Sequence, residues 1–457
     1  MKRNNNIKIV KTKAKKRAKR KSRSSRPKPP KIKIKNTQKN ITGRGGLISV
    51  IRFMNTLGYD SLFKNESTFT RGANAQYSLY DIVMFSTIGY ISGISTLFGT
   101  SIIWKDRVLR KISGYTAAAD ETTIGRVFGK LRAVHIAEFE NFTHQLRKKV
   151  WVKSNTLQDT AQKLWVDADS TVTTVKGKQE GSAKGFNEKN KGALSYHPLL
   201  AFGTHTKEIL QGWFRTGSAY TSNGVVAFMK QLLAQLESDM KIVFRADSGF
   251  FNGKLFELLE ENGHDFLVKV KLRNLKALLA SQQWSSIEGK PNWEEAEFDY
   301  RAGSWSQSRR FKAVRKKNII ALENALYESI ETYDYFCYAS TLDLTCWQTH
   351  KTYGQRATSE TWIEEAKSQI RPARMNGFFA NAAAFQSAIL AYNTLKWMVL
   401  FTNDKLLKQM EIKTIRSFFV QIAAKLTYRS KQYNLNFNTE QLYQTQWNIR
   451  IKPGIPF

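Results

Sequence analysis

Three acidic positions have the residue types and spacing of a site for phosphodiester chemistry. Asp169 ends the apolar segment WVDAD, and Asp247 ends the apolar segment VFRAD shortly before a glycine. Ligands of open α/β sheets bind at the carboxyl ends of strands, where both aspartates are expected. Asp167 shares a strand face with Asp169, because residues i and i+2 point the same way, so either could be the functional residue. Taken singly, each aspartate could instead cap the next helix or turn.

The third carboxylate is Glu360, on a helix predicted over residues 356–370. At about 100° per residue, one face of this helix collects four residues: Tyr353, Arg356, Glu360 and Lys367. The neighbouring arc is apolar and is expected to pack on the sheet: Trp362, Ile363, Ala366 and Ile370. Charged helix surfaces also use i,i+4 pairs, so the spacing alone is not specific. A glutamate between two cations nevertheless suits a site for a metal and a phosphate.

Such a set of carboxylates fits two-metal catalysis. Two Mg²⁺ ions roughly 3.5–4 Å apart activate the attacking oxygen and stabilise the leaving oxygen. Mg²⁺ prefers hard oxygen ligands and keeps several waters, so two or three carboxylates suffice, and Mn²⁺ could replace it. The six histidines are scattered, and His197 is expected to be a structural hydrogen-bonding residue. A GxxxxGK[ST] loop is absent from the sequence, so ATP hydrolysis is not supported.

The composition points to a polyanionic partner. The 457 residues carry a formal net charge of +35, and nucleic acid is the commonest partner for such a charge. Residues 1–40 contain 18 Lys or Arg and no acid, so the remainder still has 35 − 18 = +17. Ribosome-associated and membrane-binding proteins are the alternatives that charge alone leaves open. The uncharged residues 83–104 contain three glycines and are predicted to be a pair of buried short helices, with no membrane span.

The chain is expected to divide into four regions. Residues 1–45 are predicted to be a disordered basic arm, with a flexible glycine-containing link over residues 36–46. Residues 46–155 show helical periodicity, and within residues 109–131 two short helices around Gly114 could form a helix-turn-helix or an ordinary hairpin. There, Thr122 is predicted to be the N-cap, and Arg126, Lys130 and Arg132 are expected to be exposed.

The remaining two regions are residues 156–375 and 376–457. The first is α/β: strands are expected at residues 164–169, 197–204, 209–215, 242–247 and 265–270, with helices at 222–237 and 253–261. Residues 271–345 look irregular and are interpreted as an insertion. The second region is expected to be helical, beginning with a core helix over residues 378–400. Two cysteines, Cys337 and Cys346, are too few for a disulfide framework, which fits a reducing cytoplasm.

These residues resemble a known family. The spacing Y-x2-R-x3-E-x6-K, formed by Tyr353, Arg356, Glu360 and Lys367, is the signature of bacterial cut-and-paste insertion-sequence transposases of the DDE type. One branch of that group is also similar in the segments DADSTVTTVKGKQEGSAKGFN (167–187), SYHPLLAF (195–202), RADSGFF (245–251) and FFANAAAFQSAILAYN (378–393). The resemblance covers residues from about 80 to 430. The basic arm is longer and more charged than is usual in this group.

The resemblance implies a fold, a reaction and a set of site residues. The fold would be RNase H-like: a mixed five-stranded sheet with a β-rich insertion at about 271–345, before the helix that carries the glutamate. The catalytic, metal-binding triad would be Asp169, Asp247 and Glu360; a following Ser or Thr favours Asp169 over Asp167, and Glu364 breaks the spacing. By the same resemblance, Tyr353, Arg356 and Lys367 would contact the DNA backbone. The helix-turn-helix interpretation of residues 109–131 adds Arg126 and Lys130 as DNA-binding residues.

The hypothesis from sequence is therefore a transposase that needs Mg²⁺ or Mn²⁺. By resemblance, water nicks one strand, and the freed 3′-hydroxyl then attacks the opposite strand or the target DNA. The partners would be the terminal inverted repeats, the target DNA and a second copy of the chain, in the cytoplasm at the nucleoid. The alternatives are an RNase H-like nuclease without strand transfer, a non-catalytic DNA-binding protein derived from a transposase, and a basic RNA- or ribosome-binding protein.

Overall fold

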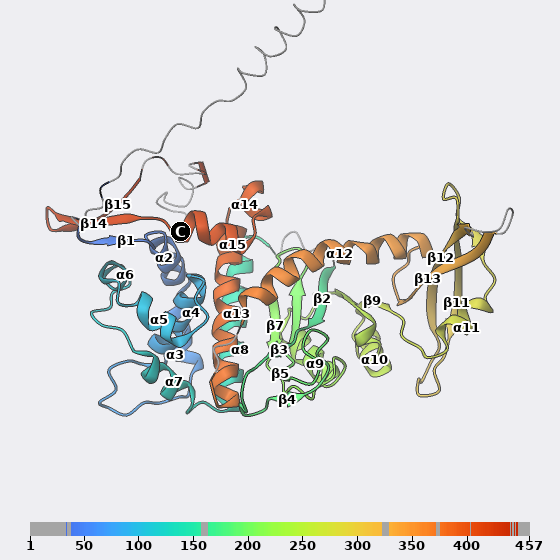
Figure 1. The fold of residues 1–457 in the computed structure, drawn as a ribbon, viewed down its shortest axis with the longest axis horizontal. Coiled ribbons are helices and arrows are strands. Elements are labelled where there is room, and N and C mark those ends of the chain that lie inside the picture. The colour runs from blue at the N-terminus through green and yellow to red at the C-terminus, as the bar shows by residue number, and fades with distance from the viewer. Residues whose placement is uncertain are drawn as a thin grey trace, which may run out of the picture. The chain divides into compact units, whose positions relative to one another are not determined.

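The structure, a computed structural model, describes most of the chain (Figure 1). The described residues are 33, 38–156, 163–321, 329–371, 375–402, 404–438, 440, 443 and 445–446. The chain separates into two units, Met1–Lys39 and Asn40–Phe457. The predicted basic arm lies largely outside the described residues. The account below concerns the second unit.

The region predicted to be helical consists of helices joined by short turns: α2 (Leu47–Leu57), α3 (Tyr59–Glu66), α4 (Leu79–Ile91), α5 (Leu97–Ile103), α6 (Arg107–Ile112), α7 (Glu121–Phe128) and α8 (Ala133–Lys153). Helix α4 is buried on all sides, as expected of an element that is apolar all round. It forms with α5 the predicted pair of short helices. Among the described residues, none of the helices has the length and hydropathy required to cross a bilayer.

The two helices predicted within residues 109–131 are α6 and α7, with Gly114 between them at φ +78. The predicted N-cap is wrong. Asp120 caps α7, accepting a hydrogen bond from the Thr123 backbone N–H at 2.7 Å, and Thr122 lies inside the first turn. Asp120, two residues earlier, is the stronger N-cap residue. Arg126 and Lys130 are exposed, as predicted.

The predicted strands pair in one mixed sheet, which continues beyond them into additional strands. Its order is β10-β11-β12-β13-β9-β8-β2-β6-β7. Five of these strands match the predicted ones: β2 (Leu164–Ser170), β6 (Leu199–Gly203), β7 (Ile209–Trp213), β8 (Ile242–Ala246) and β9 (Asp265–Lys269). The segments β2, β8 and β9 run parallel, whereas β6 and β7 are antiparallel neighbours on the other side of β2. The predicted helices between them are α9 (Val225–Gln235) and α10 (Gly253–Glu261).

Helices cover both faces of these five strands. Gly212 of β7 approaches Phe385 and Ile389 closely, whereas the next residue, Trp213, packs edge-on against Phe228 of α9 at 5.3 Å. Because adjacent residues of a strand point to opposite faces, α9 lies on one face, and α13 (Phe378–Leu400), which carries Phe385 and Ile389, lies on the other. A small three-stranded sheet, with the order β3-β5-β4, adjoins β6: β3 (Thr173–Thr174), β4 (Ala183–Lys184) and β5 (Leu194–Tyr196).

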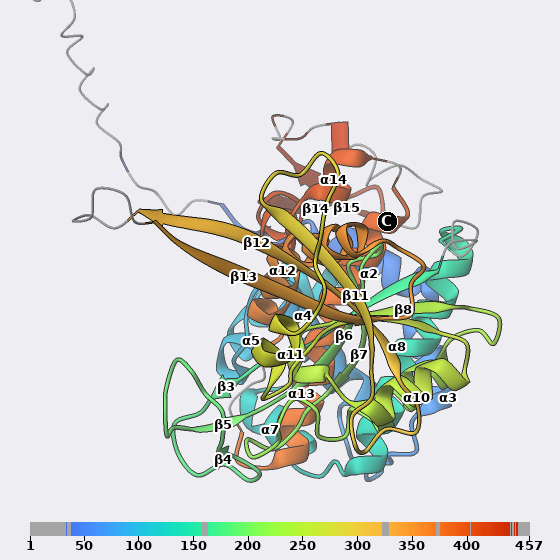
Figure 2. The same cartoon turned by 90° about the vertical axis from the view of Figure 1, so that its right-hand side faces the viewer.

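Most of the described part of residues 271–345 is regular secondary structure, which corrects the expectation of an irregular segment. They contain α11 (Leu275–Ala280), β10 (Ser285–Ser286), β11 (Trp293–Tyr300), β12 (Arg309–Ala321) and β13 (Ser329–Ser340). Strand β13 pairs with β9 through Tyr338↔Lys269, so these strands extend the main sheet. Figure 2 shows the long β12–β13 ribbon. The polar residues of these strands hide the strand pattern in the sequence. Cross-strand pairs such as Glu294 of β11 with Arg315 of β12 stabilise the pairing.

The prediction of a flexible link over residues 36–46 is also wrong for residues 41–46, which the structure describes. Ile41 and Thr42 form β1 (Ile41–Thr42), which pairs with β14 (Ala424–Arg429). A side chain at Gly46 would place its Cβ 1.9 Å from the Phe419 carbonyl oxygen. The glycine at this position therefore allows a close backbone approach.

The C-terminal region is only partly helical, which corrects a second expectation. The helices are α13, at the predicted bounds, α14 (Lys405–Gln409), α15 (Ile412–Ile415) and the π-helical turn η3 (Arg416–Val420). Strands β14 and β15 (Gln432–Phe437) then form a hairpin. Its turn residues, Ser430 and Lys431, both have positive φ, as a type I′ turn requires. Neither is the Asn or Gly that usually indicates this turn in a sequence.

Helix α13 binds the outer edge of the sheet through its polar side chains. Asn393 accepts a hydrogen bond from the Ile209 N–H and donates one to the Ile209 carbonyl, each at 2.8 Å. Gln386 donates to the Gly212 carbonyl at 2.8 Å. These side chains satisfy the backbone groups that an edge strand otherwise leaves unpaired. They explain why a largely apolar, buried helix carries amides.

A carboxylate buried beside this helix makes stability depend on pH. Glu140 of α8 accepts hydrogen bonds from Gln231 and Gln386, and burial raises its pKa to about 7 from 4.5. The unfolded chain therefore ionises first as the pH rises. As the pH rises from about 4.5 to about 7, the unfolding free energy of the wild type should fall by ~3 kcal/mol relative to that of Glu140→Gln. Urea unfolding of both proteins across this range measures the difference. A difference that is constant with pH would contradict this prediction.

Candidate active site

Asp169 and Asp247 lie beside each other at the ends of neighbouring parallel strands. Strands β2 and β8 pair in register through Ala168↔Ala246, and the two aspartates are the next residues along. Both lie on the sheet face that Asp167 and Arg245 also occupy, two residues earlier on each strand. The expectation that the two strands bring their carboxylates to one edge of the sheet is therefore met by the pairing.

Local backbone contacts fix each aspartate. The Asp169 Oδ1 accepts a hydrogen bond from the Ser170 N–H at 2.8 Å, and Asp247 caps the 3-10 turn η2 (Ser248–Phe250) through the Gly249 N–H, also at 2.8 Å. A Cβ at Gly249 would lie 3.0 Å from the Asp247 Oδ1 and 3.2 Å from Thr221. The glycine therefore leaves room for this carboxylate. Each aspartate keeps its second oxygen, Oδ2, for other partners.

Helix α12 (Cys346–Gln369) supplies the remaining charged groups, and Arg356 lies among them. Its side chain is 6% exposed, and its Nη1 donates to the Glu360 Oε1 at 2.6 Å. Its Nη2 lies 3.6 Å from the Asp169 Oδ2. Burial lowers the pKa of Arg356, but Asp169, Tyr353, Asp247 and Glu360 together raise it above its usual value. All three predicted carboxylates thus act on one guanidinium group.

Lys367 and Tyr353 complete the predicted helix face. The Lys367 Nζ donates to the Asp169 Oδ2 at 2.9 Å and to Glu364 at 2.8 Å. Burial lowers the pKa of Lys367, but the carboxylates of Asp169 and Glu364 outweigh it, so the pKa is raised. Burial raises the pKa of Tyr353 to about 12, which keeps its phenol protonated at neutral pH. The apolar arc packs on the sheet as predicted, with Trp362 edge-on to Phe202.

Asp167 has a different environment from Asp169. It is fully buried, and both its oxygens bind Arg245, at 2.7 and 2.8 Å. Arg245 also donates to the Thr352 carbonyl and to the Ser359 hydroxyl of α12. This ion pair therefore joins two strands to the helix that carries Glu360. It was missed in the sequence, although an arginine inside an apolar strand beside a strand with two aspartates is a signal for it.

The two candidate glutamates of α12 also differ. Both are exposed, with side-chain exposures of 53% for Glu360 and 67% for Glu364. Glu360 binds Arg356, which also lies near Asp169 and Asp247. Glu364 binds Lys367. Each glutamate thus shares its cation with Asp169: Arg356 for Glu360 and Lys367 for Glu364.

His197 is a structural hydrogen-bonding residue, as predicted. Its Nδ1 contacts the Ala219 carbonyl, and its Nε2 lies 3.2 Å from the Ser170 hydroxyl. Burial lowers its pKa, which favours the neutral ring. The Nδ1 must then donate to the carbonyl, and the Nε2 accepts from Ser170. The histidine supports the residue that follows Asp169.

The donor chemistry of the site fits a hard divalent cation. Asp169 and Glu360 pair with the buried Arg356, and Asp247 follows the strand beside Asp169, so the position accommodates positive charge. In this structure the cations of Arg356 and Lys367 hold the acidic groups. Within the described ranges, no group of three or more His, Cys, Asp or Glu side chains is arranged closely enough to bind a metal ion. Metal binding would therefore require Glu360 or Asp169 to exchange a cation partner.

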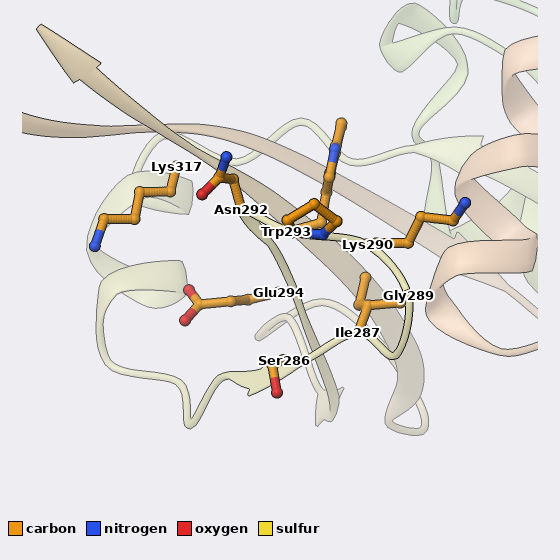
Figure 3. A pocket seen from close by; sticks show the side chains of 9 residues that line it. Ser286, Ile287, Gly289, Lys290, Asn292, Trp293, Glu294 and Lys317 are labelled. Atoms are coloured by element: carbon orange, nitrogen blue, oxygen red, sulfur yellow. The ribbon is translucent and has the colours of Figure 1, made fainter.

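The other predicted DNA contacts belong to a separate part of the fold. Arg126 lies on α7 and Lys130 follows it, and α7 packs against α13, α5 and α4. The structure does not bring these two cations to the carboxylates. A cavity of about 430 Å³ at the extension of the sheet, lined by Lys290, Trp293 and Lys317 among others, likewise contains none of the three carboxylates (Figure 3).

Comparison with known proteins identifies a matching family. Residues 25–450 match the family described as Transposase DDE domain group 1. No curated protein matches the chain. Among solved structures, the cryo-electron microscopy structure of a piggyBac transposase synaptic complex with hairpin DNA is similar at 12% identity. The similarity covers 84% of this chain and 82% of that chain, with a TM-score of 0.40.

Proposed function

This chain belongs to the Transposase DDE domain group 1 family, and we propose that it cleaves DNA at the ends of a mobile element and transfers the freed strand to new DNA. The observation that carries the proposal is that Asp169 and Asp247 follow paired residues of neighbouring parallel strands, while Arg356 contacts both Asp169 and Glu360. Three carboxylates from two strands and a helix would repel one another without a cation between them. Such a site suits metal-dependent phosphoryl transfer.

The triad would hold the divalent ions, Mg²⁺ or Mn²⁺. When bound, two such ions supply activation of the attacking oxygen and stabilisation of the leaving oxygen. Asp169 is the better candidate than Asp167, because the Asp167 carboxylate is buried and bound at both oxygens by Arg245. Glu360 is the better candidate than Glu364, because it fits the Y-x2-R-x3-E-x6-K spacing and binds Arg356, which also lies 3.6 Å from Asp169.

The cations of α12 would hold the DNA backbone at this site. Arg356 and Lys367 are charged at neutral pH, and both contact Asp169. A phosphate group could bind them once the carboxylates are occupied by metal. Tyr353 keeps its proton and can donate a hydrogen bond to a phosphate oxygen. These residues would thereby position the scissile phosphate and offset its charge.

Further parts of the proposal concern the fold and the assembly. We propose that the five strands β7-β6-β2-β8-β9 form an RNase H-like core over residues 156–375, interrupted by the extension at about 271–345. Residues 46–155 would bind DNA, through Arg126 and Lys130, and residues 1–45 would add non-specific affinity. Two copies would act together on the two ends of the element, in the cytoplasm at the nucleoid.

The direct test is a cleavage and joining assay on the inverted repeats that flank the gene. Wild-type protein with Mg²⁺ should release a DNA segment carrying these repeats and join it to a target plasmid, and EDTA should abolish both products. Cleavage without joining would instead indicate a nuclease. If no cleavage occurs with Mg²⁺ or Mn²⁺ while the DNA is bound, the protein is a non-catalytic DNA-binding protein and the proposal is wrong.

A further inference from the structure

A basic pocket lies beside α7, outside the candidate active site. It has a volume of about 360 Å³ and lies between the loop of residues 69–75 and the end of α7. Arg71 comes from the loop, and Arg126 and Lys130 come from α7 and the turn after it. Among the described residues that line the pocket, none is Asp or Glu. Three cations therefore face one cavity without a carboxylate in its wall.

The pocket wall is held in place by contacts of its own. The Arg71 Nη1 donates to the Tyr77 carbonyl, and Phe69 packs edge-on against the ring of His135 at 5.1 Å. The Ala75 N–H donates to the Gly72 carbonyl at 2.9 Å, closing a turn in the loop. On the other side, α7 is anchored by buried apolar residues such as Val127. The cations thus converge from two anchored elements.

Asp120, the carboxylate at the start of α7, accepts its hydrogen bonds from the first turn of that helix. Asp120 accepts hydrogen bonds from the Thr122 hydroxyl at 2.9 Å and from the Thr123 N–H at 2.7 Å. These bonds lower its pKa, with the Thr123 backbone as the largest cause, and the charge of Arg126 lowers it further. The Arg126 Nη2 donates to the Thr123 hydroxyl at 3.2 Å, which leaves its other donor groups for a ligand. The pocket therefore keeps an excess of positive charge.

We propose that this pocket binds a backbone phosphate of duplex DNA. Arg71 of the loop would contact this phosphate together with Arg126 and Lys130 from α7 and the turn after it. The inference rests on the proposed function and names the kind of contact that α7 makes. Phosphate contacts fix the position of a protein on DNA but carry no sequence information. The cations of α7 would consequently anchor the duplex, and sequence would be read by other residues.

Ala73 offers a test that leaves the three cations intact. It is exposed and lines the pocket. Ala73→Glu places a carboxylate where the phosphate would bind, and Ala73→Gln is the matched neutral control. Fluorescence anisotropy with the full chain should give a Kd for Ala73→Glu weaker by on the order of tenfold, by the same factor on a terminal-repeat duplex and on a scrambled duplex. Ala73→Gln should bind both duplexes like wild type.

Salt dependence gives a second, independent measurement. For Arg71→Gln, the slope of the logarithm of the DNA-binding constant against the logarithm of the salt concentration should become shallower by about one. Arg52→Gln is the control: it removes an exposed arginine of α2 outside the pocket and should leave the slope unchanged. Equal affinities of Ala73→Glu and Ala73→Gln would overturn the proposal. So would a loss confined to the terminal-repeat duplex, which indicates base reading. Tight binding of inorganic phosphate alone, measured by calorimetry, would assign the pocket to a free anion instead.

The outcome can be separated from that of the proposed function. Cleavage with Mg²⁺ is measured separately on the wild-type chain, because the candidate active site contains none of the residues that line the pocket. If the chain binds DNA through this pocket but never cleaves it, the pocket proposal stands and the catalytic one fails. If the wild-type chain cleaves DNA and Ala73→Glu has no effect on binding, the catalytic proposal stands and the pocket proposal fails.

Discussion

Asp247→Asn should reduce DNA strand cleavage at least about a thousandfold, equivalent to ~4 kcal/mol of transition-state stabilisation, and leave DNA binding unchanged. Asparagine keeps the oxygen that accepts the Gly249 N–H, so η2 should remain capped. It removes the negative charge that a divalent ion requires. Single-turnover cleavage with Mg²⁺ gives the rate, and anisotropy at matched salt gives the affinity.

Glu360→Gln and Glu364→Gln form the matched pair for the helix. Both residues are exposed and each binds one cation of α12, so the structural costs of the two substitutions should be similar. Only Glu360→Gln should reproduce the loss seen with Asp247→Asn. If Glu364→Gln causes the larger loss of cleavage, Glu360 is not the third residue of the triad. If neither affects cleavage, α12 supplies no metal ligand.

Arg245→Met should destabilise the fold by about 3–5 kcal/mol, because it leaves the Asp167 carboxylate buried without its cation. The side chains of Arg245 and Asp167 are 2% and 0% exposed, so water cannot replace the lost partner. Replacing both residues, with Asp167→Leu and Arg245→Met, should restore much of the stability. Urea unfolding followed by tryptophan fluorescence measures all three proteins.

An exposed ion pair provides the control for this prediction. Arg310 lies 3.2 Å from Glu297, with both side chains exposed, and Arg310→Met should change the unfolding midpoint little. A similar small change for Arg245→Met would show that the buried pair does not stabilise the fold. A double variant as unstable as the single one would show that the arginine acts mainly through its bonds to α12.

Much of the core could be predicted because its signals are local. The strands β2, β8 and β9 are short apolar segments, and α13 has apolar residues throughout, so their positions follow from the sequence pattern. The two aspartates follow from the rule that ligands bind at strand ends. The start of α12 was placed ten residues too late. Thr345 and Gln348 form a capping box, a local signal that was available in the sequence.

The remaining features depend on contacts between distant residues. The β14–β15 hairpin turns through Ser430 and Lys431, whose left-handed backbone is not indicated by their residue types. The arginine inside an apolar segment suggests a buried ion pair, but its partner Asp167 is identified only when β2 and β8 are aligned. Arg71 lies in a loop without periodicity, and its place beside α7 follows from the packing of that loop. Sequence patterns do not encode such neighbours.

The amides of α13 have a consequence for how this architecture can vary. Asn393 and Gln386 occupy the hydrogen-bonding groups of β7, so no further strand can be added at that border of the sheet. The sheet does extend on the other side of the five-stranded core, where β13 joins β9. An accessory segment can therefore lengthen or shrink there without altering the spacing of Asp169 and Asp247. Inserted segments can therefore extend this sheet on the β9 side and not on the β7 side.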